Sequence, residues 1–163
     1  MVHIELFIFF SAKKFEESDM FSLCSALEKN TTLKALSIPG RKLTIPALVR
    51  LSEMLKTNIG LDTLSLGDYE LGDEGLALLA EGIALNRGVK NLDMSYKSLS
   101  PRAGLLLSKI SIANMTLVDL NLSRNSLRDE GILDFWVGIS NGGLPSLKIL
   151  NIGEIPLPHT YYV

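Results

Sequence analysis

The sequence has few of the residues that catalysis, metal binding or a disulfide framework requires. Its 163 residues include one cysteine, Cys24, and two histidines, His3 and His159, which lie at opposite ends. One cysteine excludes an intrachain disulfide and is typical of a reducing compartment. No Cys/His cluster has the spacing of metal ligands. We therefore expect no metal, no cofactor and a cytoplasmic location.

The sequence also lacks a large excess of charge of one sign and a long apolar run. The net charge is −2, with Lys and Arg spread along the chain, so the sequence lacks the basic stripe that nucleic-acid binding requires. The apolar run HIELFIFFSA at 3–12 is far shorter than the ~20 residues of a membrane-spanning helix. We expect neither nucleic acid nor membrane as a partner. Apolar residues make up 47% of the chain, enough to bury a core.

What the sequence does have is an internal repeat. Five segments fit the pattern LxxLxL, and their starts are 28, 28, 28 and 30 residues apart: LKALSI from Leu33, LDTLSL from Leu61, VKNLDM from Val89, LVDLNL from Leu117 and LKILNI from Leu147. Two further columns keep the 28-residue period: Asn30, Asn58, Asn86 and Asn114, and Leu43, Leu71, Leu99 and Leu127. Three columns that stay in register indicate stacked structural repeats.

Each repeat unit has a strand half and a helix half. The LxL segment alternates apolar and polar residues, which predicts a half-buried strand. In 71–86, four apolar residues recur at helical spacing: Leu76, Leu79, Ala80 and Ile83. A single unit cannot bury its apolar face, whereas stacked copies can. The sequence therefore predicts an α/β solenoid, an arc with a parallel sheet on its concave face and helices on its convex face. We expect about five strand–helix units and a final strand.

These residues resemble leucine-rich repeat proteins of the long, helix-containing subtype found in ribonuclease inhibitor. The segments LGDEGLALLAEGIALNRG (71–88) and LNLSRNSLRDEGILDFW (120–136) carry the resemblance, which covers nearly the whole chain. It implies a single domain over 1–163, with an N-terminal unit (1–32), four repeats (33–146) and a last strand with a tail (147–163).

The chain departs from that family in the turn after each strand. The family's Asn or Cys appears here only as Asn125, and the equivalent positions hold Arg41, Tyr69 and Lys97. The buried side-chain ladder of this turn must therefore be weak or replaced. The recurring Asn column lies elsewhere, at the predicted helix ends, where Asn tolerates the left-handed conformation.

The repeat spacing also indicates the structure of the N-terminal run at 3–12. Counting back 28 residues from Leu33 and Leu36 reaches Glu5 and Ile8, so the run occupies a strand position. A signal peptide has basic residues before an uninterrupted apolar core, whereas Glu5 interrupts this run and the bases follow it. We favour a first strand over a targeting segment.

In this strand, Phe7 and Phe9 would point to the concave face. A first strand without a preceding neighbour is an uncovered edge. Three alternatives would cover this edge: a partner or a second copy of the chain, residues upstream, or the side chains of Phe7 and Phe9 folded over it.

Strand phase predicts which side chains face outward from the sheet. One column is small and polar: Ser37, Ser65, Asp93, Asn121 and Asn151. Tyr and Arg, which are common anchors of interfaces, follow the strands. The candidate partner-binding residues are Ser65, Tyr69, Asn91, Asp93, Tyr96, Asp119, Asn121, Arg124 and Asn151, with Phe7 and Phe9. The alternative is that a solvated concave face simply carries polar residues.

Four residues are explained without catalysis. Asp93 and Asp119 lie on successive strands without a nearby His or nucleophile, so a catalytic pair is not indicated. Cys24 shares a small-residue helix position with Ser52, Ala80 and Ser108 and is predicted to be packed. Trp136, in the last helix, is predicted to cover the end of the core, with an exposed contact role as the alternative.

The sequence therefore favours a non-enzymatic protein-interaction module that binds a partner protein through its concave strand face. The rigid repeat core would keep the ordering cost of binding small. One alternative is a regulator of an enzyme, as an inhibitor or GTPase activator, because the repeats also resemble Ran GTPase-activating proteins. No activating motif of that family maps onto a residue here. A structural protein that self-associates through its N-terminal edge is the other alternative.

Overall fold

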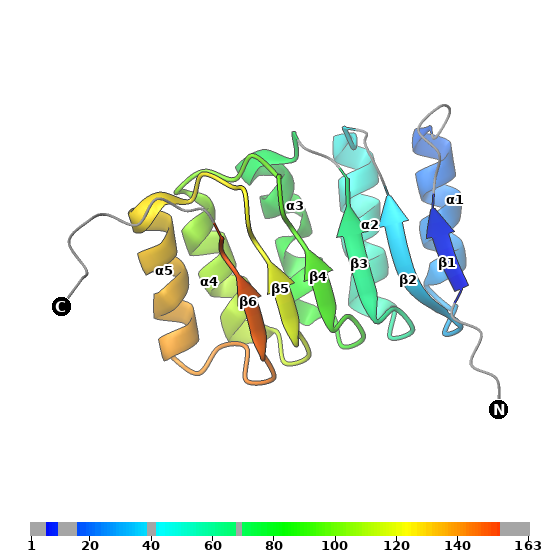
Figure 1. The fold of residues 1–163 in the computed structure, drawn as a ribbon. Helices are drawn as coiled ribbons and strands as arrows, with labels where there is room; N and C mark the ends of the chain where they lie inside the picture. The colour runs from blue at the N-terminus through cyan, green and yellow to red at the C-terminus, as the bar shows by residue number, and fades with distance from the viewer. Residues whose placement is uncertain (1–5, 10–15, 39–41, 68–69, 154–163) are drawn as a thin grey trace.

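The computed structural model describes residues 6–9, 16–38, 42–67 and 70–153, with 6–9 described as backbone only. Within these residues, strands and helices alternate strictly: β1 (Leu6–Phe9), α1 (Glu17–Leu27), β2 (Leu33–Ile38), α2 (Ile45–Thr57), β3 (Thr63–Leu66), α3 (Gly72–Leu85), β4 (Asn91–Asp93), α4 (Ala103–Ala113), β5 (Asp119–Asn121), α5 (Arg128–Ser140) and β6 (Ile149–Asn151). The strands form one parallel sheet in chain order, β1 to β6 (Figure 1).

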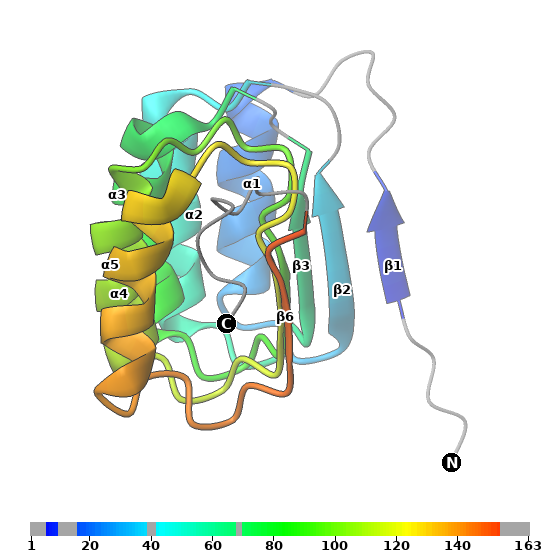
Figure 2. The ribbon, with the colours of Figure 1, turned by 60° about the vertical axis from the view of Figure 1, so that its left-hand side comes forward.

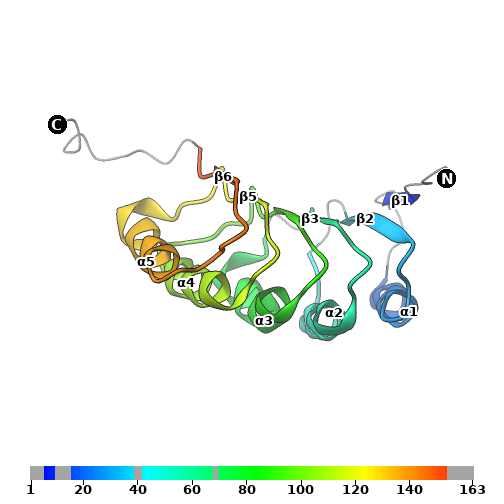
Figure 3. The ribbon, with the colours of Figure 1, turned by 90° about the horizontal axis from the view of Figure 1, so that it is seen from below.

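The molecule has two layers that curve into an arc. Figure 2 shows the helices in one layer beside the sheet, and Figure 3 shows the helices on the outer side of the arc and the strands on the inner side. Packed helices lie 8–10 Å apart and paired strands about 4.8 Å apart, so the sheet side is the shorter one. The predicted α/β repeat solenoid, with five strand–helix units and a final strand, is confirmed.

The leucines of the repeat form one continuous core. The apolar positions of LxxLxL are buried in β2 and β3, where Leu36 and Leu64 pair in register. On the helix side, α3 buries Leu76, Leu79 and Ile83 of the predicted stripe, whereas Ala80 is half-buried. Each helix packs on the next one along the chain. No helix in the described part of the chain is both long and apolar enough to cross a membrane.

Small residues let neighbouring helices approach closely. A Cβ on Gly82 of α3 would lie 2.5 Å from the Ser52 carbonyl oxygen of α2, and a Cβ on Gly138 of α5 would lie 2.7 Å from that of Ser108 in α4. Such distances are shorter than van der Waals contact. Ser52 and Ser108 occupy the small-residue position predicted to be packed, and Cys24, at the same position in α1, is fully buried.

The Asn column lies at helix ends, as predicted, but its backbone conformation differs from the prediction. Asn58, Asn86 and Asn114 follow the last residues of α2, α3 and α4 with ψ of 125°, 141° and 130°, so they are extended and not left-handed. The prediction of a left-handed cap is wrong here. An extended residue carries the chain directly from the helix toward the next strand and leaves the side chain inside the solenoid.

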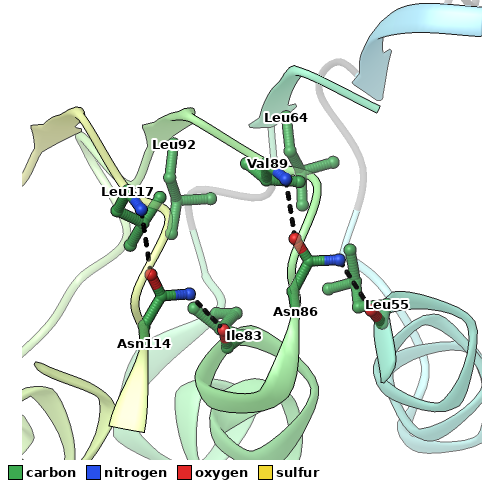
Figure 4. A pocket seen from close by; sticks show the side chains of 8 residues that line it. All are labelled: Leu55, Leu64, Ile83, Asn86, Val89, Leu92, Asn114 and Leu117. Carbon is green, nitrogen blue, oxygen red and sulfur yellow. Dashed lines mark hydrogen bonds between the residues drawn. The ribbon is translucent and has the colours of Figure 1, made fainter. Parts of the chain in front are cut away.

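These asparagines join each repeat to the one before it (Figure 4). Asn86 Nδ2 donates to the carbonyl oxygen of Leu55 at 2.6 Å, and Asn114 Nδ2 donates to that of Ile83 at 2.8 Å. The Oδ1 atoms accept from the backbone N–H groups of Val89 and Leu117, respectively. This buried ladder lies at the helix ends, outside the turn that follows each strand.

An asparagine also bridges two of the turns that follow the strands. Asn125 Oδ1 accepts from the backbone N–H of Lys97 at 2.8 Å and of Leu99 at 3.2 Å, and its Nδ2 donates to the carbonyl oxygen of Met94. Asn125 thus ties the turn after β5 to the turn after β4. Arg41 and Tyr69 lie outside the described residues.

The N-terminal run contains the predicted first strand. β1 pairs with β2 in parallel, with Ile8 opposite Leu36 and Phe9 opposite Ser37, as the 28-residue spacing predicts. The pairing of Glu5 with Leu33 is wrong, because Leu6 lies opposite Leu33 and the register shifts between Leu6 and Phe7. An irregularity of this kind accommodates one residue more or less in a strand.

Candidate partner-binding face

The predicted polar column is one continuous row across the sheet. Ser37 pairs with Ser65, Ser65 with Asp93, Asp93 with Asn121 and Asn121 with Asn151. Neighbouring strands in a sheet are about 4.8 Å apart, so the five side chains form a row with a regular spacing. The backbone of Phe9 extends this row at β1.

Hydrogen bonds fix the orientation of this row. The Ser65 hydroxyl donates to Asp93 Oδ2 at 3.4 Å. Asp93 Oδ1 accepts from the backbone N–H of Ser95 at 2.9 Å, and the Oδ1 atoms of Asn121 and Asn151 accept from the N–H groups two residues further on, at 3.1 and 3.0 Å. The same local turn therefore recurs on three strands and holds the three side chains alike.

The second row lies beside the first. Thr63, Asn91, Asp119 and Ile149 pair in register from β3 to β6. Asn91 Nδ2 donates to the Thr63 hydroxyl at 3.2 Å, whereas Asp119 is half-buried. Together the two rows present hydroxyl, amide and carboxylate groups, without a large apolar side chain until Ile149.

Two rim residues form a defined contact above these rows. The Arg124 guanidinium lies over the Tyr96 ring, with its carbon 5.1 Å from the ring centroid, a cation–π geometry. Tyr96 and Arg124 occupy equivalent positions in successive repeats, and both have left-handed backbones, with φ of 56° and 58°. The backbone N–H of Tyr96 also donates to the carbonyl oxygen of Ser123 at 3.1 Å.

The structure does not place every predicted site residue. It brings together Ser65, Asn91, Asp93, Asp119, Asn121 and Asn151 on the sheet, and Tyr96 with Arg124 at its rim. Tyr69 lies outside the described residues. For Phe7 and Phe9 the strand positions are described but the side chains are not.

An adjoining charged row was missed from the sequence. The residues just before β3 to β6 are Asp62, Lys90, Val118 and Lys148, and their backbones are joined by successive 2.8 Å hydrogen bonds that begin at the Lys34 carbonyl. Lys90 forms an ion pair with Asp62 at 3.0 Å. Asp62, Lys90 and Val118 follow one another at 28-residue intervals, so the repeat spacing was available as a signal.

The described residues of the face offer hydrogen-bonding groups. In residues 16–38, 42–67 and 70–153, no three His, Cys, Asp or Glu side chains lie close enough to hold a metal ion. Cys24 is a buried free thiol, and burial raises its pKa to about 11, so it is not an activated nucleophile. The space lined by Asn86, Asn114 and the leucines of Figure 4 is a cavity of about 10 Å³ inside the core, too small for a substrate.

Comparison with known proteins supports the fold described above. No protein-family model matches the sequence, and no curated protein matches it either. Among solved structures, the C-terminal domain of tropomodulin from Caenorhabditis elegans is similar, with a TM-score of 0.68, 18% sequence identity, and coverage of 85% of this chain and 83% of that chain. At this identity the likeness shows the fold alone. The chain is an α/β solenoid with a leucine-rich-repeat-like fold.

Proposed function

We propose that this chain is a non-enzymatic interaction module whose concave strand face binds a partner protein. The observation that carries the proposal is the pair of registered polar rows with the Tyr96–Arg124 contact at their rim. The side chains are held by the turns and by the repeat core, so little conformational entropy is lost when a partner binds. Tyr and Arg are the residues that most often contribute binding energy at such surfaces.

Two finer assignments belong to the same proposal. The 28-residue strand–helix unit supports the ribonuclease-inhibitor-like subtype of leucine-rich repeats. The buried free thiol of Cys24 supports a reducing compartment such as the cytoplasm.

Self-association through β1 is a second candidate. Among the described strands, β1 lies at one end of the sheet order and has β2 as its neighbour. An edge strand that presents unpaired backbone groups is a template for another chain.

The test of the proposal is affinity capture from the native cell with two matched triple variants. The variant of the concave face is Asp93→Ala/Tyr96→Ala/Arg124→Ala. The control, Glu74→Ala/Arg102→Ala/Glu130→Ala, removes three exposed charged side chains from the helix side. Circular dichroism and thermal unfolding first establish that both variants fold.

We expect proteins captured by the wild type to be retained by the control and lost with the variant of the concave face. Retention by the variant of the concave face, or loss with the control alone, would place binding elsewhere and overturn the proposal.

A further inference from the structure

The outer surface over α4 and α5 is unusually apolar for a helix layer that faces solvent. Leu105 and Ile112 of α4 are 58% and 54% exposed, and Leu133, Trp136 and Val137 of α5 are 57%, 41% and 55% exposed. We call these five residues the α4–α5 patch. Contiguous exposed apolar surface of this kind marks interaction sites.

Helical spacing shows that the patch is continuous. Leu105 and Ile112 are seven residues apart on α4, and Val137 lies one turn beyond Leu133 on α5, so each pair shares a helix face. Leu105 and Leu133 are 28 residues apart, at the same position in adjacent repeats, and α4 packs directly on α5. The same position in α2 and α3 holds Val49 and Ala77. The position one turn further on is charged in α2, α3 and α4 (Glu53, Glu81 and Lys109), and among these four helices it is apolar in α5 alone (Val137).

The patch does not continue the helix stack. In α2 and α4, the position that meets the following helix holds Ser52 and Ser108, against which Gly82 and Gly138 pack closely. In α5 that position holds Trp136, which stacks on Phe135 with ring centroids 6.1 Å apart. An indole there excludes another helix at the same spacing, so whatever covers α5 packs differently from a further repeat.

The charges around the patch indicate the kind of partner. Lys109 lies between Leu105 and Ile112 on α4, and Asp134 lies beside Leu133 on α5. Neither side chain forms an ion pair with a described residue. Further charged residues border the patch, with Arg102 just before α4 and Arg128, Asp129 and Glu130 in the first turn of α5. Charges of both signs do not form the basic cluster that a membrane surface attracts. Lys109 on α4 and Asp134 on α5 make the α4–α5 patch complementary in charge to the same patch of a second copy.

We infer that the α4–α5 patch is the interface of a two-fold symmetric homodimer. In a two-fold interface, residue i meets j of the partner and j meets i, so packing α4 of one copy on α5 of the other places Lys109 opposite Asp134 twice. Because the helices lie on the side of the arc opposite the strands (Figure 3), the dimer leaves both concave faces open. Two faces in one assembly raise avidity for a repeated or multimeric partner.

The test is sedimentation velocity of the full chain over a range of concentrations, read together with the fluorescence of Trp136, the one tryptophan in the sequence. We expect a monomer–dimer equilibrium in which the tryptophan emission shifts to longer wavelength on dilution, because the indole becomes solvated. Leu133→Glu is expected to weaken dimerisation by about a hundredfold, since it buries a charge in the interface. Its matched control, Val49→Glu at the same position of α2, should leave dimerisation unchanged.

Exchanging the charges of Lys109 and Asp134 distinguishes this dimer from a dimer with another interface. Lys109→Glu and Asp134→Lys are each expected to weaken dimerisation, by juxtaposing like charges, and the double variant Lys109→Glu/Asp134→Lys is expected to restore it. A monomer at every concentration, or a dimer insensitive to Leu133→Glu, overturns the inference, and the second result would point to the β1 edge. Dimerisation that the double variant does not restore overturns the two-fold pairing. None of these outcomes depends on partner capture by the concave face.

Discussion

Asn86, which follows the last residue of α3, donates from Nδ2 to the carbonyl oxygen of Leu55 in α2 at 2.6 Å. Its Nδ2 also reaches the carbonyl oxygen of Asn58, and its Oδ1 accepts from the N–H groups of Gly88 and Val89. One buried side chain thus satisfies four backbone groups of two repeats. Backbone groups left unpaired in a core are costly, so this relationship holds adjacent repeats in register.

Asn86→Ala is expected to lower the free energy of unfolding by about 2–4 kcal/mol, because several buried polar groups lose their partner at once. Asn30→Ala is the matched control. Asn30 stands in the same column but is half-exposed. Among the described residues, its Nδ2 donates to the Thr32 hydroxyl and its Oδ1 accepts from the N–H groups of Thr32 and Leu33, all within its own turn. We expect the control to cost about 1 kcal/mol or less. Equal losses for the two variants in urea denaturation would contradict the ladder.

Gly82→Ala is expected to destabilise the protein by about 1–3 kcal/mol through overpacking, although alanine favours a helix more than glycine does. The reason is the 2.5 Å approach of the new Cβ to the Ser52 carbonyl oxygen, a backbone atom that cannot rotate away. Thermal unfolding measures the effect. The control is Ser22→Ala at an exposed position of α1, where the hydroxyl bonds within its own helix to the Ser18 carbonyl oxygen. A stabilised Gly82→Ala variant would show that the helices are not so closely packed.

Cys24 is expected to resist alkylation in the folded protein. Burial raises the pKa of its thiol from 9.0 to about 11, so at pH 8 the reactive thiolate is about a hundredfold scarcer than in the unfolded chain. Raising the pH from 8 to 10 should increase the native rate steadily without reaching a plateau. The measurement is the mass gain with iodoacetamide in buffer and in urea.

The control for this prediction is Cys24→Ser/Ser25→Cys, which moves the thiol one residue to an exposed position. We expect this variant to react in buffer nearly as fast as in urea. Rapid labelling of Cys24 in the native wild type would show that α1 opens readily or that the thiol is accessible.

The contact between Tyr96 and Arg124 is expected to contribute little to stability. A cation–π pair at an exposed site is worth about 0.5–1 kcal/mol, and Tyr96 is 47% exposed. A double-mutant cycle with Tyr96→Ala and Arg124→Ala, followed by urea denaturation, measures this coupling. A coupling above about 2 kcal/mol would make the pair a structural element and weaken its assignment to a binding surface.

The repeat spacing predicted most of the fold because one period fixes many positions together. The concave rows, from Ser65 and Asp93 to Asn151, follow from strand phase alone, since side chains alternate between the two faces of a strand. The same spacing placed β1, although Glu5 was assigned to the position opposite Leu33 that Leu6 occupies.

Other features depend on contacts between repeats, which a one-dimensional pattern does not contain. The extended backbone of Asn58, Asn86 and Asn114 follows from the carbonyl that each side chain reaches in the preceding repeat. The Arg124–Tyr96 contact likewise requires two left-handed residues on adjacent turns. Which partner the face binds is not encoded in the period, because the rows are composed of common polar residues.

The most direct test of the central claim is hydroxyl-radical footprinting of Tyr96 with and without a purified captured partner. The Tyr96 ring is exposed at the rim of the concave face, and Phe21, an exposed aromatic residue of α1 on the helix side, serves as the internal reference. If the concave face binds the partner, oxidation of Tyr96 falls severalfold on complex formation while that of Phe21 stays the same. Unchanged oxidation of Tyr96 in a saturated complex would contradict the proposal.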